Sequence, residues 1–306
     1  MSTKPTIFIS ICSYRDPMLK YTVDSLLSTK SNETDIVISI LDQSKNPNEI
    51  PPLDNIIYKQ INPEYSNGMG WARHLNSLNL TNEDFYYQID SHDIFDNDWD
   101  IFLVNDYIKY SNYYNTNKVI LTSACKEFII DSNNQFIKYG SKNDTTITWY
   151  QIEKDDIVLT AHSGYYNSQP NEIIPAIHIH GGNLFTHSDY IKNIGLNPYL
   201  STREIESYTT LIAFAHDYKL CHHTKIFNYH LIYNMQYYPT KLHVDPVISL
   251  ERQRQIDEIS LAHWKDLIEN INPDILERYR EYSGIDYINR QHKPREMMKL
   301  CRSIFI

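Results

Sequence analysis

The sequence predicts an α/β fold with a largely parallel sheet, and two observations support this prediction. Short runs of β-branched residues alternate with amphipathic segments along residues 1–125, which is the order of β-α-β units. Apolar residues make up 42% and charged residues 22% of the 306 residues, so the chain can bury a large core and lacks the composition of a disordered protein. We therefore expect a single domain over residues 1–306.

Apolar periodicity and turn residues define the elements of the first half. A strand is expected at residues 7–12, and a helix follows at residues 18–27. Three prolines make residues 46–54 a loop, and a glycine turn opens a helix at residues 68–78. The same criteria predict strands at residues 35–41, 56–61, 85–89 and 119–123, and a helix at residues 99–110.

The second half is less regular. Residues 126–174 are polar, and we expect short strands and loops there. An apolar strand broken by Gly181-Gly182 is expected at residues 177–185, followed by a helix at 204–218 and a strand at 225–233. Residues 250–282 are charged and helical in pattern.

Charge and cysteine usage exclude several classes of protein. Lys and Arg number 28 and Asp and Glu number 38, so the net charge is −10 and broad binding to nucleic acid or to an anionic membrane is not expected. The four cysteines lie far apart and form no C-x-x-C pair, which argues against a disulfide framework or a thiolate zinc site. With no apolar run of signal or membrane-span length, we expect a cytoplasmic protein.

Polar residues follow three of the predicted strands, at residues 10–16, at Asp42-Gln43 and at residues 90–92. The carboxyl ends of parallel strands share one edge of a sheet, where ligands bind, so a nucleotide fits there. In the first cluster Tyr14 is placed to contact the base of such a nucleotide and Arg15 its diphosphate, because a guanidinium matches phosphate geometry. The alternative is that Arg15 and Asp16 form a surface turn.

The segment Asp90-Ser91-His92 offers a carboxylate and an imidazole from one short turn. Such a mixed oxygen and nitrogen set suits Mn²⁺ or another divalent cation, which would neutralise charge on a departing diphosphate. The alternative is a strand end capped by Asp90 with His92 exposed.

Other polar residues leave two interpretations open. Arg73 lies early in a predicted helix, where anions are favoured, or else faces solvent. Gln88 is either a packed core residue or a nucleotide contact. Gly181-Gly182-Asn183 fits a close approach of the backbone to a bound ligand, or a β-bulge. Histidines at 178 and 180 are expected in the core or in an acceptor pocket, and His222-His223 in a surface loop.

Together the segments ISICSYRDP, the Ala72-Arg73 helix start, YYQIDSH and Trp99-Asp100 resemble the polypeptide N-acetylglucosaminyltransferases that modify hydroxyproline on a cytosolic protein. Gly182–Phe185, Asn228-Tyr229-His230 and residues 282–286 fit more loosely. The Asp-Ser-His motif is also similar to that of the mucin-type GalNAc-transferases. The chain departs from the family pattern at Met69-Gly70-Trp71 and at Arg203-Glu204.

The resemblance implies a GT-A glycosyltransferase fold, a Rossmann-like mixed sheet flanked by helices. It divides the single domain into a nucleotide-sugar half (residues 1–125), an acceptor half (126–250) and a C-terminal helical extension (251–306). It implies a retaining, metal-dependent enzyme that moves a sugar, GlcNAc by our expectation, from a UDP-sugar to a hydroxyl of a protein or glycan. A nucleotide-sugar-binding protein without turnover and an unrelated metal hydrolase are the alternatives.

The resemblance also assigns site residues. Asp90 and His92 would bind the metal, with His230 as the expected third ligand and His243 as the alternative. Glu204 and Glu206 bracket Ile205, so at most one of them faces a pocket if the segment is helical. By the resemblance Glu204 would orient the acceptor hydroxyl or the transferred sugar, and Glu204 and Asp90 are the expected catalytic residues. The expected donor-binding residues are Ser13, Tyr14, Arg15, Gln43, Arg73, Gln88, Ser91, Gly181, Gly182 and Asn183.

Overall fold

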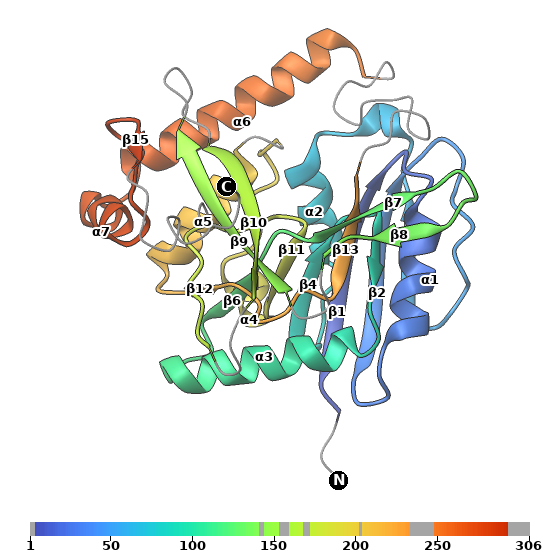
Figure 1. Cartoon of the computed structure of the whole chain (residues 1–306). Coiled ribbons are helices and arrows are strands. Elements are labelled where there is room, and N and C mark those ends of the chain that lie inside the picture. The colour runs from blue at the N-terminus through green and yellow to red at the C-terminus, as the bar shows by residue number, and fades with distance from the viewer. Residues whose placement is uncertain are drawn as a thin grey trace.

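The computed structural model describes residues 4–140, 144–152, 159–167, 172–201, 204–232 and 248–292. A seven-stranded sheet at its centre has the strand order β12-β6-β11-β4-β1-β2-β3 (Figure 1). The strands are β1 (Thr6–Tyr14), β2 (Asp35–Gln43), β3 (Ile56–Gln60), β4 (Phe85–Ile89), β6 (Val119–Thr122), β11 (Asn183–His187) and β12 (Lys219–Cys221).

The pairing of these strands confirms the α/β prediction and makes the sheet mixed. Strands β1 to β4 are parallel neighbours, as expected from the β-α-β order. Strand β11 is antiparallel to both β4 and β6, while β12 is parallel to β6. Strands β11 and β12 come from the predicted acceptor half of the chain, so both halves contribute to one sheet.

Alternation along the strands gives each face of the sheet its own core. On β1, Ile7 and Ile9 point toward α1 (Leu19–Thr29) and α3 (Trp99–Tyr114), while Phe8 points to the other face. That second face packs against α4 (Asp189–Asn193) and α5 (Ile205–Ala215). The helix α2 (Met69–Ser77) also lies on it, because the amide of Asn76 bonds to β1 and β2.

A smaller four-stranded sheet stands beside the carboxyl end of β4, in the order β5-β13-β7-β8. Met18 and Phe128 belong to its apolar core. Its strands are β5 (Asp93–Phe95), β7 (Lys126–Ile130), β8 (Phe136–Lys138) and β13 (Asn228–Leu231). Two hairpin-like pairs, β9 (Asp144–Ile152) with β10 (Leu159–Asn167) and β14 (Ile285–Asp286) with β15 (Gln291–His292), complete the strands described.

The helical region expected at residues 250–282 is two helices, α6 (Leu250–Asn270) and α7 (Pro273–Ser283). The break follows from the sequence, because the Asn272 side chain caps the new helix and Pro273 occupies its first turn. Trp264 of α6 and Tyr279 of α7 pack with Leu211 of α5 in a third apolar cluster. None of the helices described combines the length and the hydrophobicity that a membrane crossing requires.

Two expected strands are shorter in the structure. In place of a strand over residues 177–185, regular pairing begins only at Asn183. Ile177 and Ile179 are buried outside the sheet, because they pack against the C-terminal helices and the second face of the sheet. The strand expected at residues 225–233 begins at Asn228 as β13 and belongs to the four-stranded sheet. An apolar run indicates that a segment is buried, and a loop can be buried as well as a strand.

The expectation of a surface loop for His222-His223 is wrong, since the two side chains are 1% and 0% exposed. The Nδ1 atom of His222 lies 3.0 Å from the Thr122 carbonyl oxygen, and His178 lies buried 3.1 Å from Ser207 Oγ. Burial lowers the pKa of His178 to about 3, that of His222 to about 4 and that of His223 to about 3. These three rings are therefore neutral in the folded protein at neutral pH.

We expect the protein to lose stability as the pH falls below about 6.5, before most carboxylates titrate. The unfolded chain binds protons on these histidines near the ordinary pKa, whereas the folded chain does not, so their contribution to stability is fully present above pH 6.5 and is lost as the pH falls toward 4. Each ring contributes up to about 1.4 kcal/mol per pH unit to the loss. Urea unfolding at pH 7, 6 and 5 measures it. His178→Gln should reduce the slope, and exposed His216→Gln should not; a flat profile contradicts the prediction.

Candidate metal and donor site

Three side chains converge at the carboxyl end of β4. One ligand atom from each of Asp90, His92 and His230 lies within 4.8 Å of the others. The Nε2 atoms of the two histidines are 2.7 Å apart, and His230 Nε2 is 3.6 Å from Asp90 Oδ2. Asp90 and His92 come from the turn between β4 and β5, and His230 comes from β13. The sequence motif and its expected third residue therefore meet, whereas His243 lies outside the described residues.

Asp16 holds His92 in place. Its buried Oδ2 lies 2.6 Å from His92 Nδ1 and accepts a hydrogen bond from Ser91 Oγ at 2.6 Å. A carboxylate on one ring nitrogen orients the other nitrogen, which is the usual support for a metal-binding histidine. Nε2 of His92 thus points toward His230 and Asp90.

The pKa values of the two histidines are shifted in opposite directions. Burial lowers the pKa of His92, but the hydrogen bond to Asp16 and the nearby carboxylates outweigh it and raise that pKa to about 9. Burial and the charge of His92 lower the pKa of His230 to about 4. His92 therefore carries the proton between the two rings, and a cation bound by both rings would displace it.

Arg73 supplies positive charge on the other side of Asp90. Its guanidinium is buried and lies 3.6 Å from Asp90 Oδ1. Burial alone would raise the pKa of Asp90, but the electrostatic interactions with His230, Arg73 and His92 outweigh it and lower the pKa. The carboxylate is therefore ionised, as a metal ligand must be. The expected solvent-facing alternative for Arg73 does not hold.

Only glycine fits at residues 181 and 182, because charged side chains lie directly against the backbone there. A Cβ on Gly182 would lie 2.2 Å from Asp90 Oδ2, and one on Gly181 would lie 2.7 Å from Arg73 Nη1. Any larger residue at either position would push against the charged groups of the site. The backbone here runs directly along the carboxylate and the guanidinium.

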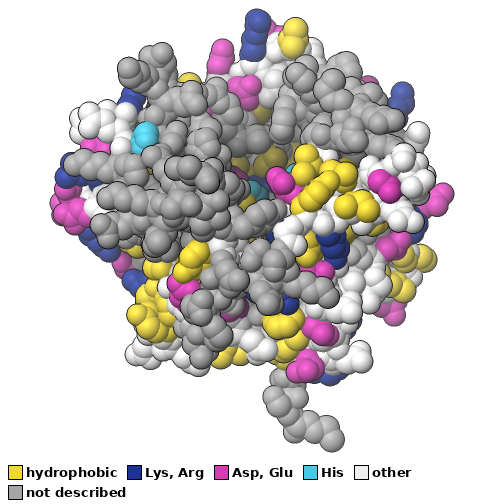
Figure 2. Space-filling model, in the orientation of Figure 1, with side chains coloured by type: hydrophobic (Ala, Val, Ile, Leu, Met, Phe, Trp, Pro, Cys, Tyr) yellow, Lys and Arg dark blue, Asp and Glu magenta, His cyan; other side chains and the backbone are white. Residues whose placement is uncertain are grey.

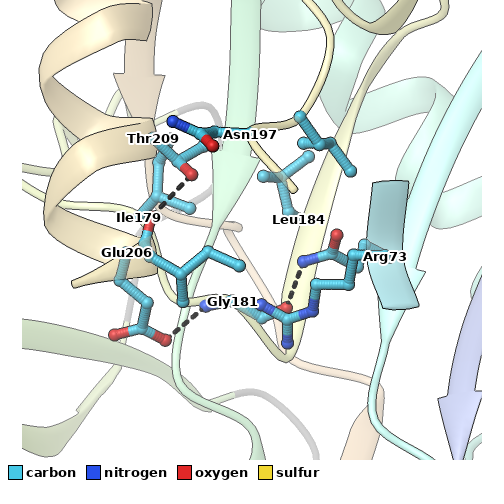
Figure 3. Close-up of a pocket in the computed structure, with 10 residues that line it drawn as sticks. Arg73, Ile179, Gly181, Leu184, Asn197, Glu206 and Thr209 are labelled. Carbon is cyan, nitrogen blue, oxygen red and sulfur yellow. Dashed lines mark hydrogen bonds between the residues drawn. The ribbon is translucent and has the colours of Figure 1, made fainter. Parts of the chain in front are cut away.

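A pocket of about 330 Å³, counted with its open mouth, adjoins this backbone. Gln88 Nε2 donates to the Gly181 carbonyl oxygen at 2.6 Å, and the Gly181 amide donates to Glu206 Oε1 at 2.6 Å (Figure 3). Figure 3 shows Arg73 and Glu206 on either side of Gly181. The remaining lining residues are Ile179, Leu184, Leu196, Asn197, Ile205 and Thr209.

A second group of polar atoms lies at the carboxyl ends of β1 and β2. Ser13 is paired in register with Asp42, and Tyr14 with Gln43. Among the described residues, the buried Ser13 Oγ, Asp42 Oδ1 and Gln43 Oε1 make no hydrogen bond within the protein. Buried polar atoms without partners are uncommon, so these three oxygens point to a ligand at this edge. Arg15 is exposed beside them, with φ of 54°.

Other expected site residues are engaged within the protein. Ser91 is bonded to Asp16, and Asn183 Nδ2 lies 3.3 Å from Asn228 Oδ1, while the buried Asn183 Oδ1 makes no hydrogen bond among the described residues. Glu204 is buried and accepts hydrogen bonds from Ser201 Oγ at 3.0 Å and Ser260 Oγ at 2.6 Å, which join α5 to α6. The carboxylate that lines the pocket is that of Glu206, whereas that of Glu204 lies between α5 and α6.

The sequence assigns no site role to Asp16, and the resemblance favours Glu204 over Glu206. In the sequence Asp16 fits one half of a surface turn, although its position after a strand and before Pro17 also places it at the ligand edge. The choice between Glu204 and Glu206 depends on which side of the helix start faces the pocket. No spacing in the sequence specifies that side.

Surface charge agrees with the composition, because acidic and basic side chains are interspersed among the described residues on the face in Figure 2.

A protein-family model described as "Glycosyltransferase (GlcNAc)" matches residues 46–265. Among solved structures, GalNAc-T7 with UDP, GalNAc and Mn²⁺ is similar at a TM-score of 0.58 and 13% identity, over 92% of this chain and 55% of that chain. This chain thus spans about half the length of GalNAc-T7. Residues 1–349 of S. aureus TarS with UDP-GlcNAc give a TM-score of 0.47 and 10% identity, over 97% of this chain and 83% of that one. A comparison with curated proteins finds no match.

Proposed function

Because the chain belongs to the GlcNAc glycosyltransferase family and has the GT-A fold, we propose that it transfers GlcNAc from UDP-GlcNAc to a hydroxyl of a protein or glycan. The observation that carries this proposal is the convergence of Asp90, His92 and His230 beside Arg73 at the carboxyl edge of the sheet. A nucleotide diphosphate bound there meets a cation on one side and a guanidinium on the other.

The ligand set fits a divalent cation. One carboxylate oxygen and two imidazole nitrogens leave room for diphosphate oxygens, and Mn²⁺ accepts such a mixed set. When bound, the cation would neutralise the charge that develops on the departing diphosphate. The three residues hold it, and Asp16 orients one of them.

The nucleotide is assigned to the ends of β1 and β2. The oxygens of Ser13, Asp42 and Gln43 can accept hydrogen bonds from the uracil N–H or the ribose hydroxyls. Tyr14 and Arg15 follow directly on β1, where the aromatic ring and the guanidinium remain our proposed contacts for the base and the diphosphate.

The pocket beside Gly181 suits the sugar. Arg73, Gln88 and Glu206 offer donors and acceptors for hydroxyl groups, and the glycine backbone allows close approach. The aliphatic wall, with Asn197 and Thr209 in it, matches an acetamido group that combines a methyl with an amide. This supports an N-acetylhexosamine over a plain hexose.

We propose transfer with retention of configuration. The bond between the sugar C1 and the diphosphate oxygen breaks, the acceptor oxygen attacks C1 from the same face, and its proton passes to the leaving diphosphate. Arg73 stabilises that diphosphate, and Asp90 keeps Arg73 in position. Glu206 holds the sugar through its hydroxyls, so no covalent nucleophile is required.

Release of UDP from UDP-GlcNAc, measured with and without EDTA, tests the function. We expect release that EDTA abolishes and Mn²⁺ restores, faster than with UDP-glucose, and an α-linked product by NMR coupling. Binding of UDP-GlcNAc without release indicates the binding protein without turnover. Metal-dependent hydrolysis of unrelated esters, with no response to UDP-sugars, indicates a hydrolase. A β-linked product overturns retention.

We expect Glu206→Gln to lower activity and Glu204→Gln to lower stability. Glu206→Gln alters the group that faces the sugar and should lower kcat/KM by at least about tenfold with little change in melting temperature. Glu204→Gln weakens the charge-assisted bonds to two serines, so it should lower stability by about 1–3 kcal/mol while kcat/KM stays near wild type. Thermal melts and UDP-release kinetics on both variants measure this. The reverse pattern restores Glu204 as the catalytic candidate.

A further inference from the structure

The metal ligands come from two different sheets, and one side chain joins those sheets. Asp90 follows β4 of the seven-stranded sheet, whereas His230 lies in β13 of the four-stranded sheet. Asn228 stands two residues before His230, so the two side chains leave β13 on the same face. The amide of Asn228 is fully buried and reaches toward both sheets.

Asn228 uses both ends of its amide. Nδ2 donates to Asp93 Oδ2 at 3.3 Å, within the four-stranded sheet, and to Cys125 Sγ at 2.9 Å. Oδ1 accepts from Asn183 Nδ2 at 3.3 Å, at the start of β11 in the seven-stranded sheet. Asp93 and Asn183 are also fully buried, so water cannot replace a contact that is lost.

The contacts of Asn228 connect it with the segments that carry or border two of the metal ligands. Asn183 follows Gly182, the glycine whose Cα faces Asp90, and the Gly182 carbonyl oxygen lies 3.9 Å from Cys125 Sγ. The same amide therefore fixes the strand that carries His230 and the backbone that lies against Asp90. A change in its hydrogen bonds would shift one sheet relative to the other and alter the spacing between these two ligands.

We propose that Asn228 is a positioning residue, whose amide sets the separation of Asp90 from His230 and thereby the affinity for a divalent cation. The inference rests on the proposed function, because it assumes a cation bound by Asp90, His92 and His230. Partners that orient metal ligands from outside the coordination sphere typically change metal affinity by about 10–100-fold when they are replaced.

The experiment uses the full chain and measures the Kd for Mn²⁺ in the presence of UDP, by the decrease of the free Mn²⁺ signal in electron paramagnetic resonance. Asn228→Asp replaces Nδ2 by a carboxyl oxygen, so the amide hydrogen bonds to Asp93 Oδ2 and Cys125 Sγ are lost. We expect the Kd to rise at least about tenfold. The double variant Asn228→Asp with Asp93→Asn restores an amide–carboxyl pair in reversed order and should recover most of the affinity.

The matched control is Asn55→Asp, which removes one amide donor to the Ile36 carbonyl oxygen at the opposite end of the sheet and should leave the Kd unchanged. Thermal melting of every variant separates loss of fold from loss of binding. If Asn228→Asp does not fold, Asn228→Ala, which removes the same amide contacts without adding a carboxyl group, carries the test and should also raise the Kd. Unchanged affinity in Asn228→Asp, or weakened affinity in a folded double variant, overturns the proposal. Wild-type protein that binds no Mn²⁺ overturns the metal site itself, and this inference with it.

Discussion

His230→Ala is expected to weaken metal-dependent UDP binding by at least about a hundredfold and turnover by about 10²–10³-fold, since it removes a direct ligand rather than a supporting partner. The remaining contact between Asp16 and His92 does not involve His230, so the turn after β4 should keep its conformation. Calorimetric titration with Mn²⁺ and UDP measures the binding, and UDP release from UDP-GlcNAc measures the turnover.

The control for this variant is His187→Ala, at a half-buried histidine that lies 3.2 Å from Asp189 away from the cluster. Both variants lose one imidazole, but only His230→Ala should lose metal dependence. Thermal melts within a few degrees of wild type would show that neither variant unfolds. Tight, EDTA-sensitive UDP binding in His230→Ala would exclude His230 as a ligand and reopen the choice of His243.

The strand ends could be predicted from sequence because their information is local. Ile7, Ile9 and Ile11 alternate with polar or aromatic residues, and this places the end of β1, and so Tyr14 and Arg15, at the ligand edge. The position of the Asp90-Ser91-His92 turn could be predicted in the same way, because it follows the end of β4, which is the parallel neighbour of β1. Resemblance then supplied the late histidine, which the structure brings to the same turn.

The residues that sequence reasoning missed depend on contacts between distant segments. Asp16 meets His92 across 76 positions, and Asn228 meets Asp93 across 135. Glu206 faces the pocket only because Glu204 is bonded to Ser260 of α6, a helix whose placement no local pattern specifies. The buried pair His222-His223 follows the short strand β12, which pairs with β6 at one edge of the seven-stranded sheet. From the sequence alone, polar residues that follow a short strand cannot be distinguished from residues of an exposed loop.

Gly182→Ala is expected to abolish metal binding with a modest loss of stability. The added Cβ would lie 2.2 Å from Asp90 Oδ2 and 2.9 Å from its Cγ, distances that nonbonded atoms do not adopt. Gly182 does not have the positive φ that disfavours other residues, so alanine fits the backbone there. The strain is therefore relieved by rotation of Asp90, which takes Oδ2 away from His230 and Oδ1 away from Arg73.

The stability cost of this variant should be about 1–3 kcal/mol, as for other overpacked sites, whereas metal affinity should fall beyond measurement. Gly284→Ala serves as the control, because it strains the left-handed cap of α7 (φ of 77°) by about 1 kcal/mol and lies outside the metal cluster. Urea unfolding and Mn²⁺ titration of both variants give the two quantities. Because Asp90 is the carboxylate of the cluster, a Gly182→Ala protein that still bound Mn²⁺ tightly would mean that the cation does not depend on the position of Asp90 seen here.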